Sequence, residues 1–252
     1  MKFGRWSKAV IPALVLALGG CSDGGSDAID ANVGQRADAP TAAGETAQGA
    51  KIPVMGPERR ILAFGDSLFA GYGLNDKDAS YPSRLQAALR ARGVNAQVTN
   101  AGVSGDTTAA GLQRFAFTLD AQDTPPDLVI VELGGNDLLR QISPDQTRAN
   151  LDAILTQLKD RGIPAVLMGM RAPPNFGPEY QRDFDQLYAD LARKHGAALV
   201  PFFLDSIYRD PKNFQSDRIH PTAPAIEILV GATIDTVAEA LPSSDGPAAS
   251  GG

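Results

Sequence analysis

The chain has one cysteine, two histidines and one tryptophan among its 252 residues. A single cysteine cannot form an intramolecular disulfide, so the chain is not a small secreted scaffold held together by disulfides. The same count excludes zinc clusters built on several cysteines. Any mechanism that needs an imidazole must use His195 or His220. The formal net charge of −6 argues against a protein that binds a nucleic-acid backbone, which usually has a basic face.

The N-terminal segment shows the order of features that is typical of a secretory signal. Three basic residues precede an apolar run at 9–18 (AVIPALVLAL), which is too short for a bilayer span of about 20 residues. Two glycines and then Cys21 follow, an order that resembles a bacterial lipobox, in which the cysteine is acylated and becomes the first residue. An ordinary secretory signal with a chance cysteine, or a short buried helix, is the alternative interpretation. Ser22 after the cysteine favours an outer-membrane destination.

Composition divides the chain into four segments. Residues 1–20 are predicted to be a lipoprotein signal peptide, and 21–57 the lipidated cysteine followed by a disordered tether. The tether is rich in alanine, glycine, aspartate and threonine and has too few large apolar residues to offset its chain entropy. Residues 58–241 are predicted to form one folded domain, and 242–252 a disordered tail. We therefore expect a location in the bacterial cell envelope, lipid-anchored at the periplasmic face of the outer membrane.

Apolar runs and helical stripes alternate along the domain. The runs 60–64, 94–100, 127–133, 165–170 and 199–203 predict strands, and the strongest is DLVIVEL at 127–133. Apolar residues at helical spacing predict helices over 82–92, 107–119, 146–161, 179–195 and 224–241. Because the strands are continuously apolar, the pattern indicates an α/β fold with a parallel sheet covered on both faces.

Polar residues and glycines follow the predicted strands at the edge where such sheets hold their active sites. They are Ser67, Gly102 and Asn136, with Asp217 and His220 before the last helix. A serine hydroxyl needs an imidazole to take its proton, and the imidazole needs a carboxylate to orient it. The oxyanion that forms at the attacked carbonyl needs fixed donors, such as a glycine N–H or an asparagine amide. The pattern therefore favours acyl transfer.

Four sequence blocks together resemble the GDSL, or SGNH, serine hydrolases. They are FGDSLFAGYG, NAGVSGDTT, VELGGNDLLR and DRIHP, and the resemblance extends to the bacterial periplasmic thioesterase, lysophospholipase and arylesterase branch. It implies a three-layer α/β/α sandwich with a flavodoxin-like, mostly parallel five-stranded sheet. It implies Ser67 as nucleophile, His220 as general base and Asp217 as its orienting carboxylate. It also implies an oxyanion hole made by Ser67 N–H, Gly102 N–H and the Asn136 side chain, with no cofactor and no metal.

Two loops are expected to contact substrate. In the branch that the sequence resembles, the loop containing Ser104, Asp106 and Thr107 borders the acyl groove. The alternative is that this loop is a solvated turn. Phe176 lies in a proline- and glycine-rich loop after a predicted strand and is expected to line the acyl pocket.

Other polar residues near these motifs are assigned to structure. Asp66 is expected to bond nearby backbone N–H groups, and Asp137 to have a structural role. The Asp66–Ser67 pair taken alone would fit a simple helix cap. His195 lies in RKHG, which is typical of a helix C-terminus, where cations face the helix dipole and a glycine ends the helix.

The sequence therefore predicts a monomeric hydrolase that cleaves ester or thioester bonds of acyl chains through an acyl-Ser67 intermediate. A small acyl ester or thioester would be its substrate, the membrane would be contacted through the lipid at Cys21, and nucleic acid would not be a partner. Two alternatives stay open. One is a deacetylase of envelope polysaccharides, and the other is a lipid-anchored binding protein without useful turnover.

Overall fold

The computed structural model describes residues 54–243, which contain a five-stranded parallel sheet with the order β2-β1-β3-β4-β5. The prediction of an α/β fold built on such a sheet is confirmed. The predicted signal peptide, Cys21, the tether up to residue 53 and residues 244–252 of the predicted tail lie outside the described residues.

The five strands follow the predicted runs closely. They are β1 Met55–Gly65, β2 Val94–Gly102, β3 Leu128–Glu132, β4 Ala165–Met168 and β5 Ala198–Val200. All residues of β3 are buried, as expected for a central strand covered on both faces. The predicted strand 199–203 is shorter because Pro201 follows β5 and has no N–H to donate to a ladder.

The first strand begins earlier than the sequence predicts. Met55 N–H donates to Gly93 O at 3.2 Å, and Met55 pairs with Val94 before a register shift ahead of Arg59. The start of β1 therefore lies inside the predicted 21–57 tether, and the folded domain begins before residue 58. The first residues of β1 are exposed, so no apolar run marks this part of the strand.

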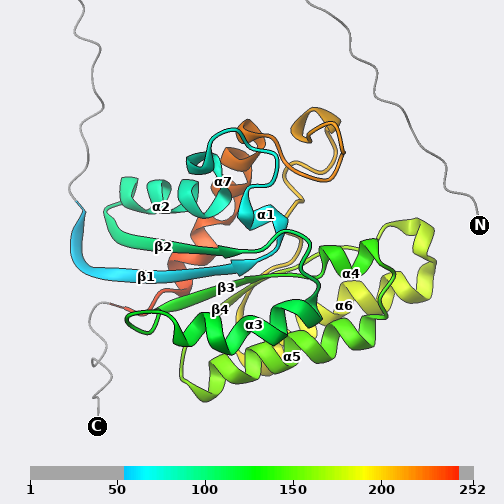
Figure 1. Ribbon diagram of the computed structural model, residues 1–252, viewed down its shortest axis with the longest axis horizontal. Helices are drawn as coiled ribbons and strands as arrows, with labels where there is room; N and C mark the ends of the chain where they lie inside the picture. The colour runs from blue at the N-terminus through cyan, green and yellow to red at the C-terminus, as the bar shows by residue number, and fades with distance from the viewer. Residues whose placement is uncertain (1–53, 244–252) are drawn as a thin grey trace, which may run out of the picture. The chain divides into compact units, whose positions relative to one another are not determined.

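Helices cover both faces of the sheet and make three layers (Figure 1). Helices α2 (Tyr81–Ala91) and α7 (Ala223–Ala240) pack on one face. Helices α3 (Thr108–Asp120), α5 (Pro144–Asp160) and α6 (Pro178–His195) pack on the other. No helix within residues 54–243 is both long and apolar enough to cross a bilayer.

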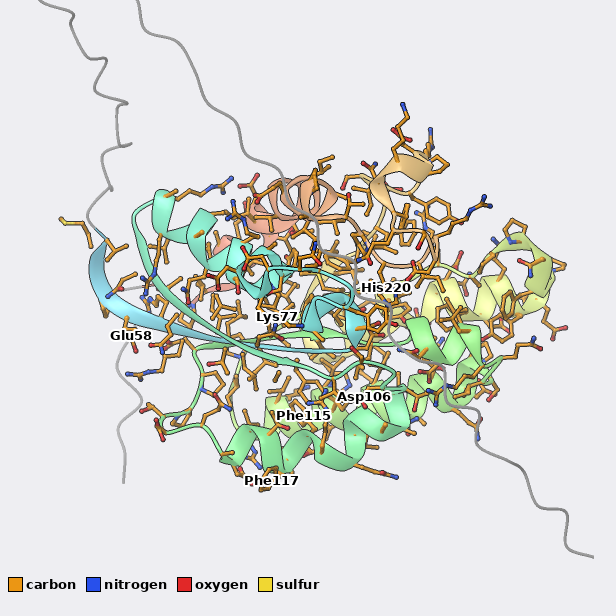
Figure 2. All side chains as sticks on the ribbon, turned by 45° about the horizontal axis from the view of Figure 1, so that its top comes forward. Glu58, Lys77, Asp106, Phe115, Phe117 and His220 are labelled. Carbon is orange, nitrogen blue, oxygen red and sulfur yellow. The ribbon has the colours of Figure 1, made fainter. Side chains whose placement is uncertain are left out.

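Several short elements were too brief for apolar periodicity to predict. Helix α1 (Ser67–Ala70) directly follows β1, and helix α4 (Gly135–Leu139) lies just beyond β3. The 3₁₀ turns are η1 (Lys77–Ala79), η2 (Pro174–Phe176) and η3 (Pro211–Asn213). Figure 2 shows His220 beside α1 at the carboxyl ends of the strands, whereas Glu58 lies at the opposite end of β1. We therefore expect the predicted site residues at the edge of the sheet where the strands have their carboxyl ends.

Candidate active site

Ser67 lies where β1 ends and α1 begins. Asp66 caps this helix, since its Oδ1 accepts the Leu68 N–H at 3.0 Å. Gly65 is required before it, because a Cβ there would lie 2.8 Å from the carbonyl oxygen of Glu132. Ser67 is 9% exposed and lines a cavity at the carboxyl edge of the sheet. The turn therefore holds the serine hydroxyl at the surface of the cavity.

His220 joins the serine to a carboxylate. Its Nε2 lies 2.9 Å from Ser67 Oγ, and its Nδ1 lies 2.7 Å from Asp217 Oδ2. The Tyr72 ring stands against the imidazole, with 4.4 Å between the ring centroids. The fold thus brings together three side chains that the sequence singled out, although Ser67 and His220 are 153 residues apart.

Asp217 is held in its ionised form by its own loop. Its Oδ1 accepts the backbone N–H groups of Ile219 at 2.9 Å and His220 at 3.0 Å. Partial burial opposes ionisation, but the hydrogen bonds from the His220 backbone, the imidazole and Ile219 outweigh it and lower the pKa of Asp217 to about 2. A carboxylate that stays charged can fix the imidazole tautomer and stabilise the imidazolium.

Asn136 lies on α4 and lines the same cavity. Its Nδ2 donates to Asp66 Oδ2 at 2.9 Å, which orients the amide and leaves its second N–H for another acceptor. The preceding Gly134 has φ of 115°, and a Cβ there would lie 2.1 Å from Tyr188 Oη. Only glycine allows the chain to turn here and present Asn136 to the cavity.

Gly102 does not occupy the position predicted for an oxyanion donor. Its N–H donates to Asn100 Oδ1 at 2.9 Å. A Cβ on Gly102 would lie 2.4 Å from Ala70 N, so this glycine serves the close packing of β2 against α1. It is also absent from the residues that line the cavity within 54–243. The assignment of Gly102 to the oxyanion hole is therefore corrected.

Gly105 is the better candidate for that position. It lines the cavity and has φ of 87°, a conformation that favours glycine. Its carbonyl oxygen accepts Arg140 Nη2 at 2.9 Å, whereas its N–H donates to no residue within 54–243. The Ser67 N–H at the start of α1 is likewise without an acceptor in that range. Gly105 is the second glycine of the NAGVSGDTT block, so this block could have pointed to Gly105 as well as to Gly102.

A buried pair of carboxyl groups, Glu132 and Asp66, supports the positions of Ser67 and Asn136. Glu132 ends β3, is fully buried, and accepts the Asp66 N–H on its Oε2 at 3.3 Å. Burial raises the pKa of Glu132 well above its usual range, and the neighbouring Asp66 carboxylate raises it further. Its Oε1 has no hydrogen-bond partner in the described part of the chain, an arrangement that is costly for a charged carboxylate. Glu132 therefore carries the proton of the pair.

Asp66 is the charged member of the pair. Burial raises the pKa of Asp66 above its ordinary value, although hydrogen bonds from the Leu68 N–H and the Asn136 amide favour the ionised form and oppose the rise. Its predicted structural role is thus visible as a direct link from Glu132 to Asn136. No sequence signal pointed to this contact, because Glu132 is simply the last residue of an otherwise apolar strand.

Two residues predicted to bind substrate turn away from the cavity. Asp106 Oδ2 accepts Arg114 Nε at 2.6 Å, and the same guanidinium donates to Gly65 O at 2.9 Å. Thr107 caps α3, since its Oγ1 accepts the Ala110 N–H at 3.3 Å. Neither side chain is among those lining the cavity in residues 54–243, so both are corrected to structural roles.

The other two predicted substrate-binding residues do line the cavity. Ser104 is an exposed residue of the lining, and Phe176 on η2 packs against Tyr180 with 5.0 Å between ring centroids. The cavity has a volume of about 320 Å³. Most of its remaining lining is apolar and comes from Leu138, Leu139, Met170, Pro173, Phe202 and Leu204. The serine therefore faces a space suited to an apolar group.

The remaining structural assignments fit the contacts. Asp137 is fully buried and accepts Thr108 N–H at 2.8 Å, which joins α4 to the start of α3. His195 ends α6 before Gly196, which has φ of 67°, and its Nε2 lies 2.6 Å from Asp152 Oδ1. His195 is thus at a helix end on the α5–α6 side and takes no part in the cavity.

A serine, an imidazole and a carboxylate in hydrogen-bonded sequence, with amide donors beside the serine, define the class of serine hydrolases. The comparison with known families agrees, because the GDSL-like lipase/acylhydrolase family matches residues 63–225. The chain belongs to that family. The prediction of a hydrolase that acts on ester bonds is therefore confirmed at the level of the family.

Individual relatives place the chain more closely. Over 162 residues it is 41% identical to an arylesterase of Vibrio mimicus, a match that spans 64% of this chain and 80% of that protein. It is 38% identical over 165 residues to the thioesterase 1/protease 1/lysophospholipase L1 of Escherichia coli strain K12, covering 66% of this chain and 76% of that one. The crystal structure of AlinE4, an SGNH-hydrolase family esterase, shares 61% identity with a TM-score of 0.63, over 75% of this chain and all (100%) of that one.

Proposed function

We propose that the protein hydrolyses esters and thioesters of acyl chains through an acyl-Ser67 intermediate. The observation that carries this proposal is the unbroken hydrogen-bonded series from Ser67 Oγ through His220 to Asp217, with distances of 2.9 and 2.7 Å, beside an apolar cavity. The apolar lining favours an acyl chain over the sugar of a polysaccharide as the group that fills the cavity.

The first half of the reaction forms the acyl-enzyme. Ser67 Oγ attacks the carbonyl carbon while His220 Nε2 takes the hydroxyl proton. The resulting oxyanion accepts hydrogen bonds from Ser67 N–H, Gly105 N–H and the free N–H of Asn136. The tetrahedral intermediate then collapses, the bond to the alcohol or thiol breaks, and the imidazolium gives its proton to the departing oxygen or sulfur.

The second half repeats these steps with water. His220 takes a proton from a water molecule, whose oxygen attacks the acyl carbon, and the same three donors receive the oxyanion. Collapse releases the carboxylic acid and returns the proton to Ser67 Oγ. Asp217 stays ionised throughout and stabilises the imidazolium in both halves.

A phosphonate labelling experiment tests the proposal. A p-nitrophenyl alkylphosphonate should add one alkylphosphonyl group to the protein, and peptide mass spectrometry should place it on Ser67. The Ser67→Ala variant should remain unlabelled. Ser104 supplies a matched control, because its hydroxyl lines the same cavity without an imidazole partner, so Ser104→Ala should still gain one group. Absence of the adduct on Ser67 in the parent would favour the non-catalytic binding protein instead.

A chain-length series separates the hydrolase proposal from the deacetylase alternative. p-Nitrophenyl esters with acyl chains from acetyl to decanoyl present the same leaving group. Burial of each additional methylene contributes about 0.8 kcal/mol when it enters apolar surroundings, so kcat/KM should rise with length until the cavity is filled. Activity limited to the acetyl ester would point to deacetylation.

We further propose that the enzyme works as a monomer at the cell envelope, anchored by lipid on Cys21. The order of basic residues, apolar run and cysteine supports the anchor. The hydrogen-bonded series Ser67–His220–Asp217 is complete without a residue from a second copy, which supports the monomer. Cells grown with labelled palmitate should incorporate label into the parent protein but not into a Cys21→Ser variant. Incorporation into both would show that Cys21 is not the acylated residue.

A further inference from the structure

Arg218 has an unusual backbone conformation directly beside the candidate triad. Its φ is 60°, in the left-handed region that favours glycine, and among the described non-glycine residues only Gln141 shares a positive φ. It stands between Asp217 and Ile219 in the DRIHP block, where glycine would fit the conformation without strain. A long cationic side chain at such a position suggests that the side chain itself has a function.

The side chain faces an apolar depression that continues the cavity. This depression has a volume of about 470 Å³ and shares Leu204, Tyr208 and Ile219 with the cavity of Ser67. Pro211, Phe214 and Arg218 complete its lining. Because Ile219 immediately precedes His220, the depression opens on the imidazole side of the cavity.

Arg218 has no charged partner among the described residues. Arg218 is exposed and forms no ion pair and no side-chain hydrogen bond within residues 54–243. Its neighbour Asp217 is committed to His220, and Asp210 of the same loop accepts the Lys212 N–H. A second cation, Arg171, lines the cavity over the ring of Phe202, at 5.4 Å from the ring centroid.

The reaction determines which part of a substrate reaches this depression. His220 must protonate the departing oxygen or sulfur, so the leaving group has to lie on the imidazole side of Ser67. With the acyl chain in the remaining apolar part of the cavity, a leaving group would extend over Ile219 and Tyr208 toward Arg218, since these two residues line both spaces.

We propose, building on the proposed hydrolase function, that Arg218 binds a negative charge on the leaving group. The substrate class is acyl esters or thioesters whose alcohol or thiol carries an anionic group, above all a phosphate. Arg218 is then a specificity-determining residue, and its backbone strain is retained because glycine would lose the cation. A phosphoglycerol headgroup and a phosphorylated thiol carrier share this chemistry.

The test compares two hexanoyl esters, one of 4-acetylphenol and one of 4-hydroxybenzenesulfonate. The measured quantity is the ratio of kcat/KM for the anionic ester to that for the neutral ester. Arg218→Asn removes the charge and accepts the left-handed backbone, whereas Arg218→Lys keeps both charge and strain. Lys159→Gln is the matched charge control, because Lys159 is exposed near the end of α5, at the opposite edge of the sheet.

The expected result is a ratio roughly threefold to tenfold lower in Arg218→Asn, the range between an exposed ion pair and a charged hydrogen bond. The ratio should be retained in Arg218→Lys and in Lys159→Gln, and in the parent it should fall as salt is added. An unchanged ratio in Arg218→Asn would overturn the role of Arg218, while hydrolysis of the neutral ester would leave the proposed function standing. If the parent cleaves neither ester, the proposed function fails first and this proposal fails with it.

Two further substrate pairs distinguish the sources of the anion. Lysophosphatidic acid is compared with monoacylglycerol, and an acyl-coenzyme A with the acyl thioester of a neutral thiol. The pair whose ratio falls more in Arg218→Asn identifies a phosphoglycerol or a phosphorylated thiol as the preferred leaving group. Either fall supports the proposal, and no fall in both pairs contradicts it.

Discussion

Replacement of Glu132 by glutamine tests the buried carboxyl pair beneath the site. Glutamine has nearly the shape of a protonated glutamate and keeps an oxygen that can accept the Asp66 N–H. It differs because it has no proton to lose. The variant should therefore fold like the parent and lack only the dependence of stability on pH that Glu132 introduces.

The sign of that dependence follows from the raised pKa of Glu132. In the unfolded chain the carboxyl ionises around its ordinary pKa of 4.5, whereas the folded protein keeps it protonated to higher pH. Stability from this group is complete below pH 4.5 and is lost as the pH rises toward the folded pKa. Over the pH range in which the folded protein keeps this proton and the unfolded chain has lost it, the loss amounts to about 1.4 kcal/mol per pH unit.

Thermal unfolding at pH 5 and pH 7, followed by circular dichroism, measures the effect. For a domain of this size each kcal/mol corresponds to about 2–4 °C in Tm. The Tm of Glu132→Gln minus that of the parent should therefore increase by a few degrees from pH 5 to pH 7. The exposed Glu239 on α7 offers a matched control, and Glu239→Gln should show no such increase. An equal Tm difference at both pH values would refute the buried protonated state of Glu132.

Three further substitutions probe the site and its support. Asn136→Ala should lower kcat by roughly 10²–10³ with little change in Tm, since one oxyanion donor is lost; unchanged turnover would remove Asn136 from the mechanism. Gly105→Ala meets no atom closer than 3.8 Å but strains a φ of 87°, so steady-state kinetics should show kcat falling by about tenfold or more while the fold persists. Gly134→Ala places a Cβ 2.1 Å from Tyr188 Oη and should cost about 2 kcal/mol or more of unfolding free energy in denaturant titrations; a stability equal to that of the parent would contradict the packing argument.

The main elements of the fold could be predicted because burial leaves a clear pattern. The apolar run at 127–133 became the central strand β3, and the apolar stripe over 146–161 became α5. The start of β1 could not be predicted in this way, because exposed residues there are held by pairing with β2. Helices α1 and α4 escaped prediction because a single turn is too short to show a period of 3.6 residues.

The candidate triad could be predicted because each member follows a strand or precedes a helix at one edge of the sheet. The structure brings Ser67 and His220 to 2.9 Å as that argument requires. Substrate contacts were harder to predict, because a polar residue in a loop near the site has several possible partners. Asp106 illustrates this, since its carboxylate is paired with Arg114 from the following helix. Nothing in the local sequence distinguishes this ion pair from a contact with substrate.

Gly102, which ends β2, and Gly105 in the following loop show the limit of reasoning from strand ends. Gly102 is the last residue of β2 and pairs with Gly65, so the sheet rule selected it. Its amide is bonded to the Asn100 side chain, and its Cα is packed against α1. The chain then leaves the sheet and reaches the cavity wall at Ser104 and Gly105, the second of which has φ of 87°. A strand end fixes the edge at which a site lies, whereas the loop beyond it decides which N–H faces the substrate. The candidate oxyanion hole therefore depends on the conformation of residues 103–106. A regular spacing of apolar residues predicts helices and strands, but it does not predict the conformation of such a loop.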